Sequence, residues 1–202
     1  MRLTEKPALI ESDLQYKIIT QPKTCKFAYR ICIEALQIQK PHEQKWSEVF
    51  PNVDIEQWKT INKMPFQCTL NTKLQASQYK IIHRLLGTRK MLKLCNITQE
   101  DTCIWCQDNT ETITHLFVTC PVVGALWDEI REWLNQFLEC DINTETIIFG
   151  DKDSLVASSI TLIVKYYIFL CSLREQRPSL IGVQQSIRME MLVEKEISKK
   201  TR

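Results

Sequence analysis

Hydrophobic residues recur at helical spacing along most of the chain, which predicts a protein built mainly of α-helices. The clearest pattern lies in residues 71–87 and predicts an amphipathic helix that ends at Gly87. Its apolar positions are Leu74, Ile81, Ile82 and Leu85, and its neighbouring polar positions are Lys73, Ser77, Lys80 and Arg84. The sequence holds only 4 glycines, which argues against a fold rich in strands and tight turns. We therefore expect an irregular helical bundle.

Further helices are predicted on both sides of this one. Residues 24–39 form a helix that Pro41 stops, and two short helical pieces in residues 43–50 and 54–62 are separated by Pro51. Asp54 is suited to cap the second piece, and Trp46, Phe50 and Trp58 are expected in the core. Pro121 is suited to the first turn of a later helix. The apolar stripe of that helix is Val123, Leu126, Trp127, Ile130, Leu134 and Phe137.

The last quarter of the chain predicts two more helices, over residues 151–178 and from residue 179 to the end. The stretch 154–173 is apolar enough to suggest a membrane span, but it contains several Ser and Thr residues, and Lys165 lies at its centre. A buried core helix is therefore expected, with no membrane partner. Lys165 is expected to snorkel or to pair with an acidic residue.

Charge is unevenly distributed along the chain, although the total is only +2. Residues 51–96 carry eight basic and two acidic side chains, whereas residues 97–153 carry two basic and twelve acidic ones. This arrangement predicts that a polyanion contacts the first segment and avoids the second. Nine cysteines, an odd number, together with an N-terminus that lacks an apolar signal, predict reduced thiols and an intracellular protein, nuclear or cytoplasmic.

A cluster of possible metal ligands lies within residues 103–120. Cys103, Cys106, His115 and Cys120 follow the spacing C-x2-C-x8-H-x4-C. Three thiolates and one imidazole suit Zn²⁺, and four protein ligands leave no position for water or substrate, so the expected role of one bound zinc ion is structural. Two alternatives are free buried thiols beside a hydrogen-bonded histidine, and a redox pair at Cys103 and Cys106. The redox pair would need a βαβ setting that the sequence does not show.

Residues 72–130 resemble the carboxy-terminal zinc-binding region of LINE-type (non-LTR) retrotransposon reverse transcriptases. The resemblance is carried by three short patterns and extends more weakly over residues 45–197. The first is a Q-Y-x-hydrophobic-x-HR helix at Gln78, Tyr79, His83 and Arg84, and the second is a D-x-C-x2-C knuckle at Asp101, Cys103 and Cys106. The third is an H-hydrophobic-F-x2-C-P-x-V-x3-W segment at His115, Phe117, Cys120, Pro121, Val123 and Trp127.

This resemblance implies a non-catalytic domain that binds RNA or single-stranded DNA. It also implies the parent reverse transcriptase as a further partner. The polymerase's Tyr/Phe-Ala-Asp-Asp signature and an endonuclease's carboxylate set are absent from the sequence, and no small-molecule substrate is expected. The expected domains are an N-terminal helical extension (1–44), a zinc-binding domain (45–150) and a C-terminal helical hairpin (151–202). The expected nucleic-acid contacts are Lys73, Lys80, His83, Arg84, Arg89, Lys90 and Lys93.

The alternative function is a protein-interaction or scaffold module of retroelement origin, either a fragment of an element or a cellular gene derived from one. In that case the acidic residues Asp128, Glu129 and Glu132 would face a basic partner. A redox or hydrolytic enzyme has little support, because the sequence shows neither a phosphate-cradling glycine loop nor a nucleophile elbow.

Overall fold

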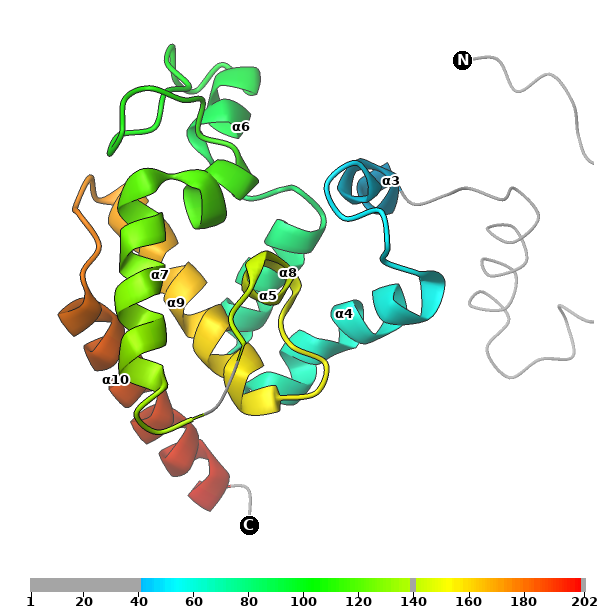
Figure 1. Cartoon of the computed structure of the whole chain (residues 1–202), viewed down its shortest axis with the longest axis vertical. Helices are drawn as coiled ribbons and strands as arrows, with labels where there is room; N and C mark the ends of the chain where they lie inside the picture. Colours follow the sequence, from blue (N-terminus) through cyan, green and yellow to red (C-terminus); the bar gives the residue numbers. More distant parts are fainter. Residues whose placement is uncertain (1–40, 139–140, 201–202) are drawn as a thin grey trace, which may run out of the picture. The chain divides into compact units, whose positions relative to one another are not determined.

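The computed structural model describes residues 41–138 and 141–200, and the chain divides into two compact units, residues 1–44 and 45–202. The predicted helix over residues 24–39 lies outside the described residues. Within them the structure is helical and contains no β-strand, so the predicted mainly α-helical class is confirmed (Figure 1). The described elements are α3 (Pro41–Ser47), α4 (Ile55–Cys68), α5 (Thr72–Ile82), α6 (Arg89–Leu94), the π-helical turn η1 (His115–Thr119), α7 (Pro121–Leu134), α8 (Thr144–Phe149), α9 (Leu155–Leu173) and α10 (Leu180–Lys200).

The second unit is organised around α9, which packs against α4, α5, α8 and α10. By length and composition alone α9 could cross a membrane, and 56% of its most apolar window is buried inside the protein. Helices α9 and α10 belong to the same compact unit as the residues around the cysteine cluster. The segment beyond residue 150 therefore packs with the rest of that unit. A domain boundary at residue 150 stays a prediction.

Lys165 is buried in the middle of α9, with 1% of its surface exposed. Its amine donates hydrogen bonds to Gln78 Oε1 at 2.6 Å and to the carbonyl oxygen of Ile148 at 2.9 Å. The prediction that this lysine would snorkel or pair with an acid was wrong, because two neutral oxygens from α5 and α8 converge on it. Burial lowers the pKa of Lys165 to about 7, and Cys68 would act in the opposite direction only as a thiolate.

An aromatic cluster around Phe149 joins α3, α4 and α8. The ring of Phe149 lies 5.4 Å from that of Trp46, 5.0 Å from that of Phe50 and 5.3 Å from that of Trp58, with edge-to-face inclinations. Trp46 is fully buried, and its indole Nε1 donates to the carbonyl oxygen of Ile82 at 2.8 Å. The three aromatic residues expected in the core therefore lie in it or pack against it.

Two of the predicted helix starts are confirmed, one by a capping box and one by a proline at the first helical position. Asp54 caps α4 through a capping box, in which its side chain accepts from the Gln57 N–H while the Gln57 side chain accepts from the Asp54 N–H, both at 2.8 Å. Pro121 is the first residue of α7. Helix α4 continues past its predicted end at residue 62 and contains Pro65.

Helices α5 and α7 both end earlier than predicted. Helix α5 stops at Ile82, because Arg84 adopts the left-handed conformation (φ 58°), and a Schellman-type pair of hydrogen bonds closes the helix at Ile81 and Lys80. In this turn Leu85 is 52% exposed and Leu86 is 1% exposed. A helix that continued to Gly87 would instead have placed Leu85 on the buried apolar face. Ser77, expected on the polar face of α5, is also buried.

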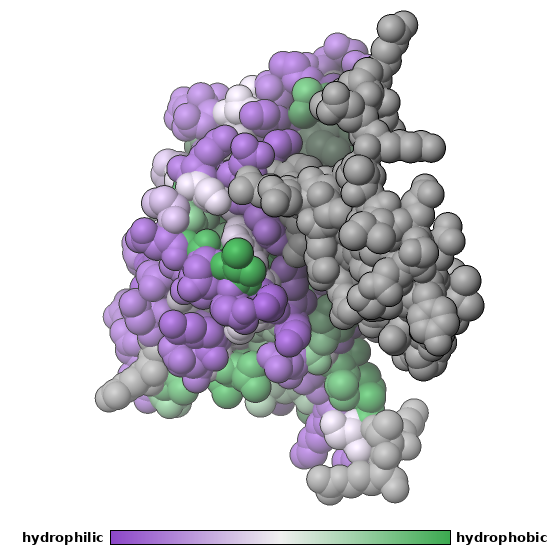
Figure 2. Space-filling view, turned by 90° about the vertical axis from the view of Figure 1, so that its right-hand side faces the viewer, coloured by the Kyte–Doolittle hydropathy of each residue, from purple (hydrophilic) through white to green (hydrophobic). Residues whose placement is uncertain are grey.

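Helix α7 ends at Leu134, three residues before the predicted last member of its stripe, and Phe137 is therefore 73% exposed. The remaining stripe residues of α7 are buried as expected. On the face shown in Figure 2, hydrophilic residues predominate and hydrophobic ones gather near the lower edge.

Candidate metal centre

The segment between α6 and η1, residues 95–114, folds into a tight loop that carries the first two cysteines. We call this segment the metal loop. Thr102 and Thr110 form an isolated antiparallel bridge at its base, and the Cys103 N–H donates to the carbonyl oxygen of Asn109 at 2.8 Å. Gln107 takes the left-handed conformation (φ 58°), and its N–H bonds back to the carbonyl oxygen of Cys103 at 3.0 Å. Because the loop reverses within a few residues, both cysteines of the C-x2-C pair face the same side.

The other two candidate ligands stand at the two ends of the π-helical turn. His115 is its first residue and Cys120 follows its last, and the Cys120 N–H donates to the His115 carbonyl oxygen at 3.0 Å. The wider π-helical turn therefore brings both side chains to the metal loop. Cys120 also precedes Pro121, so the site lies at the start of α7.

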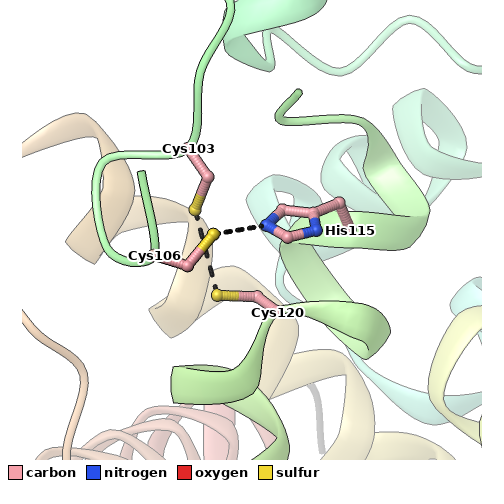
Figure 3. Close-up of side chains that lie close together, drawn as sticks. All are labelled: Cys103, Cys106, His115 and Cys120. Atoms are coloured by element: carbon pink, nitrogen blue, oxygen red, sulfur yellow. Dashed lines mark hydrogen bonds between the residues drawn. The ribbon is translucent and has the colours of Figure 1, made fainter. Parts of the chain in front are cut away.

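The four candidate ligand atoms converge on one point (Figure 3). All of them lie within 4.8 Å of one another. Cys103 Sγ is 3.9 Å from Cys120 Sγ, and Cys106 Sγ is 3.4 Å from His115 Nε2. Three of the residues are buried and Cys106 is partly exposed.

These separations fit a tetrahedral zinc ion. With Zn–S bonds of about 2.3 Å and Zn–N bonds of about 2.0–2.1 Å, a tetrahedron places two sulfurs about 3.8 Å apart and a sulfur and a nitrogen about 3.5 Å apart. The distances in the protein agree with both values to within a few tenths of an ångström. Since the set supplies four ligands, it would form a closed coordination shell, the arrangement of structural zinc sites.

The polar surroundings orient the histidine for this purpose. Thr119 Oγ1 lies 3.3 Å from His115 Nδ1, which leaves Nε2 directed at the sulfurs. Burial lowers the pKa of His115, so the imidazole is neutral near pH 7, as a metal ligand must be. Burial raises the pKa of the Cys103 thiol to about 12. At Cys106 burial acts in the same direction, but hydrogen bonds from the backbone N–H groups of Asp108 and Asn109, together with the side chains of Cys103 and Cys120, outweigh it and lower the pKa.

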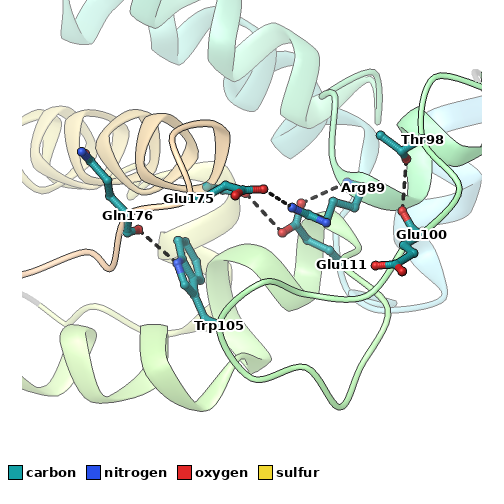
Figure 4. Close-up of polar contacts among 8 residues, drawn as sticks. Arg89, Thr98, Glu100, Trp105, Glu111, Glu175 and Gln176 are labelled. Carbon is teal, nitrogen blue, oxygen red and sulfur yellow. Dashed lines mark hydrogen bonds and ion pairs between the residues drawn. The ribbon is translucent and has the colours of Figure 1, made fainter.

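The loop is tied to its neighbours by a buried carboxylate, Glu111, which is 1% exposed (Figure 4). Glu111 Oε1 accepts from the backbone N–H of Arg89, the first residue of α6, at 3.0 Å. Its other oxygen accepts from the Ser172 hydroxyl near the end of α9 at 3.2 Å. Glu111 therefore connects the metal loop to α6 and to α9. Only its burial distinguishes Glu111 from the other acidic residues of this segment, so the sequence alone does not indicate its role.

The seven predicted nucleic-acid contacts lie along α5, its C-terminal turn and α6. Lys73, Lys80 and Lys90 are exposed and form no ion pair with any described residue. Arg89 pairs with Glu175 at 2.8 Å, and Lys93 pairs with Asp101 at 3.0 Å. His83 caps α5 and its ring lies 4.1 Å from that of the exposed Tyr79. Arg84 follows in the left-handed turn.

The fold and the site together define a small helical domain with a Cys3His cluster that can hold a metal ion. Residues 24–127 match the family described as zinc-binding in reverse transcriptase. This is half of the chain, and the protein belongs to that family. Searches among curated proteins and among solved structures gave no match. The family and the Cys3His cluster both indicate zinc as the metal.

Several residues that carry the family pattern have structural contacts that explain the pattern. Gln78 is buried, and its Nε2 donates to the Ile148 carbonyl oxygen at 2.8 Å. Trp127 is buried on α7, and its Nε1 donates to the Phe117 carbonyl oxygen at 2.8 Å, next to the metal ligands of η1. These residues hold α5, η1 and α7 in place, so the pattern describes the packing around the metal centre as well as its ligands.

Proposed function

We propose that this protein is a non-catalytic nucleic-acid-binding domain of a LINE-type retroelement, stabilised by one structural zinc ion. The observation that supports it most directly is the Cys3His centre beside a row of cationic residues on α5 and α6. The three patterns that resemble LINE-type reverse transcriptases fall on the same part of the fold. With four protein ligands the metal has no open position for a substrate, so its role is architectural.

The electrostatics favour contact through α5 and α6. Lys73, Lys80 and Lys90 supply exposed positive charge, whereas the segment that carries the metal ligands is strongly acidic. A site with three thiolates adds no positive charge to that segment. Phosphates of RNA or single-stranded DNA would therefore meet the helices, and Tyr79 offers an exposed ring on which a base can stack.

Native mass spectrometry and a salt titration test the two halves of this proposal. Purified protein should contain one zinc ion per chain, and a strong chelator should remove it with loss of helicity. Binding to labelled single-stranded RNA, followed by fluorescence anisotropy, should weaken steeply with rising salt. Lys73→Glu/Lys80→Glu should bind more weakly than the matched control Lys63→Glu/Lys152→Glu, which reverses the charge of two exposed lysines elsewhere. No binding at low salt would refute the nucleic-acid role.

A scaffold role is the second candidate, and it rests on the outer face of α7. Asp128, Glu129 and Glu132 are exposed there, and Arg131, which pairs with Asp128 at 2.6 Å, is the one basic residue of the helix. A basic protein surface, such as one on the parent reverse transcriptase, would complement this face. Affinity purification that recovers a protein partner after nuclease treatment, and loses it in Glu129→Lys/Glu132→Lys, would favour this role.

A further inference from the structure

A groove of about 380 Å³ lies between the turn after α5, helix α6 and the metal loop. We call it the α5–α6 groove. Its charged residues are Lys45, Glu48, Arg84 and Lys90, and Met91 and Leu94 contribute accessible apolar surface. Its volume lies near the lower end of ordinary ligand sites, about 300–1,000 Å³. Lys45 was not among the predicted contacts, because it lies 39 residues before Arg84 in the sequence.

The guanidinium of Arg84 is held in a fixed position at this groove. Its carbon lies 4.6 Å from the ring centroid of Trp46, and its Nη1 donates to the Lys45 carbonyl oxygen at 3.0 Å. Among the described residues no carboxylate forms an ion pair with Arg84. Since a guanidinium carries five N–H donors, most of them are left for a ligand. A planar fork that is already immobilised loses little entropy when it binds a phosphate.

The backbone of Arg84 turns sharply at the end of α5, and its side chain lies over Trp46. Arg84 occupies the left-handed C-terminal position of a Schellman motif, at φ 58°, where glycine is the favoured residue. Asn96 and Glu175 take the same conformation after α6 and α9, so what distinguishes Arg84 is the placement of its guanidinium against Trp46 and Lys45.

The other two cations of the groove are available as well. Lys45 and Lys90 are both exposed, and neither forms an ion pair within the described part of the chain. Three positive side chains therefore face one acid, Glu48. A groove that combines such an excess of positive charge with apolar surface suits a nucleotide, whose phosphate is anionic and whose base is flat and largely apolar on its faces.

We propose that the α5–α6 groove is a one-nucleotide subsite for single-stranded nucleic acid. The Arg84 guanidinium and the amines of Lys45 and Lys90 hold a backbone phosphate, and the attached nucleoside lies against Met91 and Leu94. This inference rests on the proposed nucleic-acid function and adds to it a defined subsite. Because Thr112 and Ile113 belong to the metal loop, the metal centre builds one wall of the subsite without touching the ligand.

The decisive variant is Lys45→Gln/Lys90→Gln, since both side chains are exposed and their loss leaves the core intact. Lys63→Gln/Lys152→Gln removes the same charge at two exposed lysines outside the groove. Affinity for labelled single-stranded RNA, and separately for DNA of the same sequence, is measured over a range of salt. The groove variant should bind on the order of ten-fold more weakly than the control. The negative slope of log K against log salt should become shallower by about 1.

The outcomes separate the groove from the broader function. If wild type binds and the groove variant matches the control in affinity and slope, the subsite is refuted while the nucleic-acid function stands. If wild type does not bind either nucleic acid at low salt, both are refuted. Arg84→Lys, which keeps the charge and loses the planar fork, should weaken binding with little change in the salt slope. Thermal unfolding of this variant identifies any loss that comes from misfolding.

Discussion

The buried amine of Lys165 makes the stability of this protein depend on pH in a defined direction. In the folded state the pKa of Lys165 lies at about 7, below its usual value of 10.5, because burial disfavours the charged form. Between these two values the unfolded chain binds one proton more than the folded chain. The free energy of unfolding therefore rises with pH across this window and is unaffected by Lys165 below it.

The size of the effect follows from the two pKa values. Each pKa unit corresponds to about 1.36 kcal/mol, so the full window from about 7 to 10.5 corresponds to on the order of 5 kcal/mol. Between pH 6 and pH 9 the part contributed by Lys165 is about 2–3 kcal/mol, since the group titrates gradually at the lower end. The nearby thiol of Cys68, whose pKa is raised chiefly by burial, stays protonated over most of this range.

Urea unfolding of wild type and Lys165→Met, each with zinc present in excess, isolates this contribution. Other groups titrate alike in both proteins, so the difference between their unfolding free energies should rise by about 2–3 kcal/mol from pH 6 to pH 9 in favour of wild type. Lys152→Met, at an exposed lysine, should run parallel to wild type. Parallel curves for Lys165→Met as well would refute the reasoning and show that the buried amine titrates normally.

Three further predictions follow from the same structure. Cys120→Ser should lose zinc in native mass spectrometry and at least about 3 kcal/mol of unfolding free energy, whereas Cys95→Ser, at an exposed thiol outside the cluster, should keep both. Gly150→Ala should lower the free energy of unfolding in urea by about 2 kcal/mol or more, because φ is 93° and a Cβ would overlap Met64 Sδ. Its control is Gly124→Ala, in open space on α7, which should be neutral or stabilising. Glu111→Gln should retain zinc but lower the melting temperature measured by circular dichroism, because the Arg89 N–H and the Ser172 hydroxyl lose a charged acceptor.

Local signals in the sequence predicted two helix starts and the four residues that the fold gathers into the Cys3His cluster. The capping box at Asp54 and the proline that opens α7 depend on residues within one turn, so their chemistry can be recognised without the fold. The four metal ligands lie within eighteen residues, and their spacing already restricts them to one short loop and one turn. In each case the interacting groups are close in sequence.

The helix ends and the polar contacts of the core depended on information that is not local. The sequence predicted that α5 continues to Gly87, because glycine is the usual C-terminal residue, whereas the left-handed position is occupied by Arg84. Helices α6 and α9 end in the same way, with Asn96 and Glu175 at φ 56° and 55°. The partners of Lys165, at Gln78 and Ile148, could be found only once α5, α8 and α9 were packed together.

The metal centre acts on the proposed binding surface through the loop that it holds. The Glu111 carbonyl oxygen accepts from the Lys90 N–H at 3.3 Å, and its side chain accepts from the Arg89 N–H at 3.0 Å. The start of α6 is therefore fixed to the segment that separates Cys106 from His115. Lys90 is then presented to the α5–α6 groove from a helix of only six residues, which has too few internal hydrogen bonds to be stable alone. A zinc ion that orders the loop would thereby order the helix. Under the proposed function, an acidic segment that holds the metal and a basic segment that contacts phosphate would form a single unit, in which the metal sets the geometry and the lysines supply the charge.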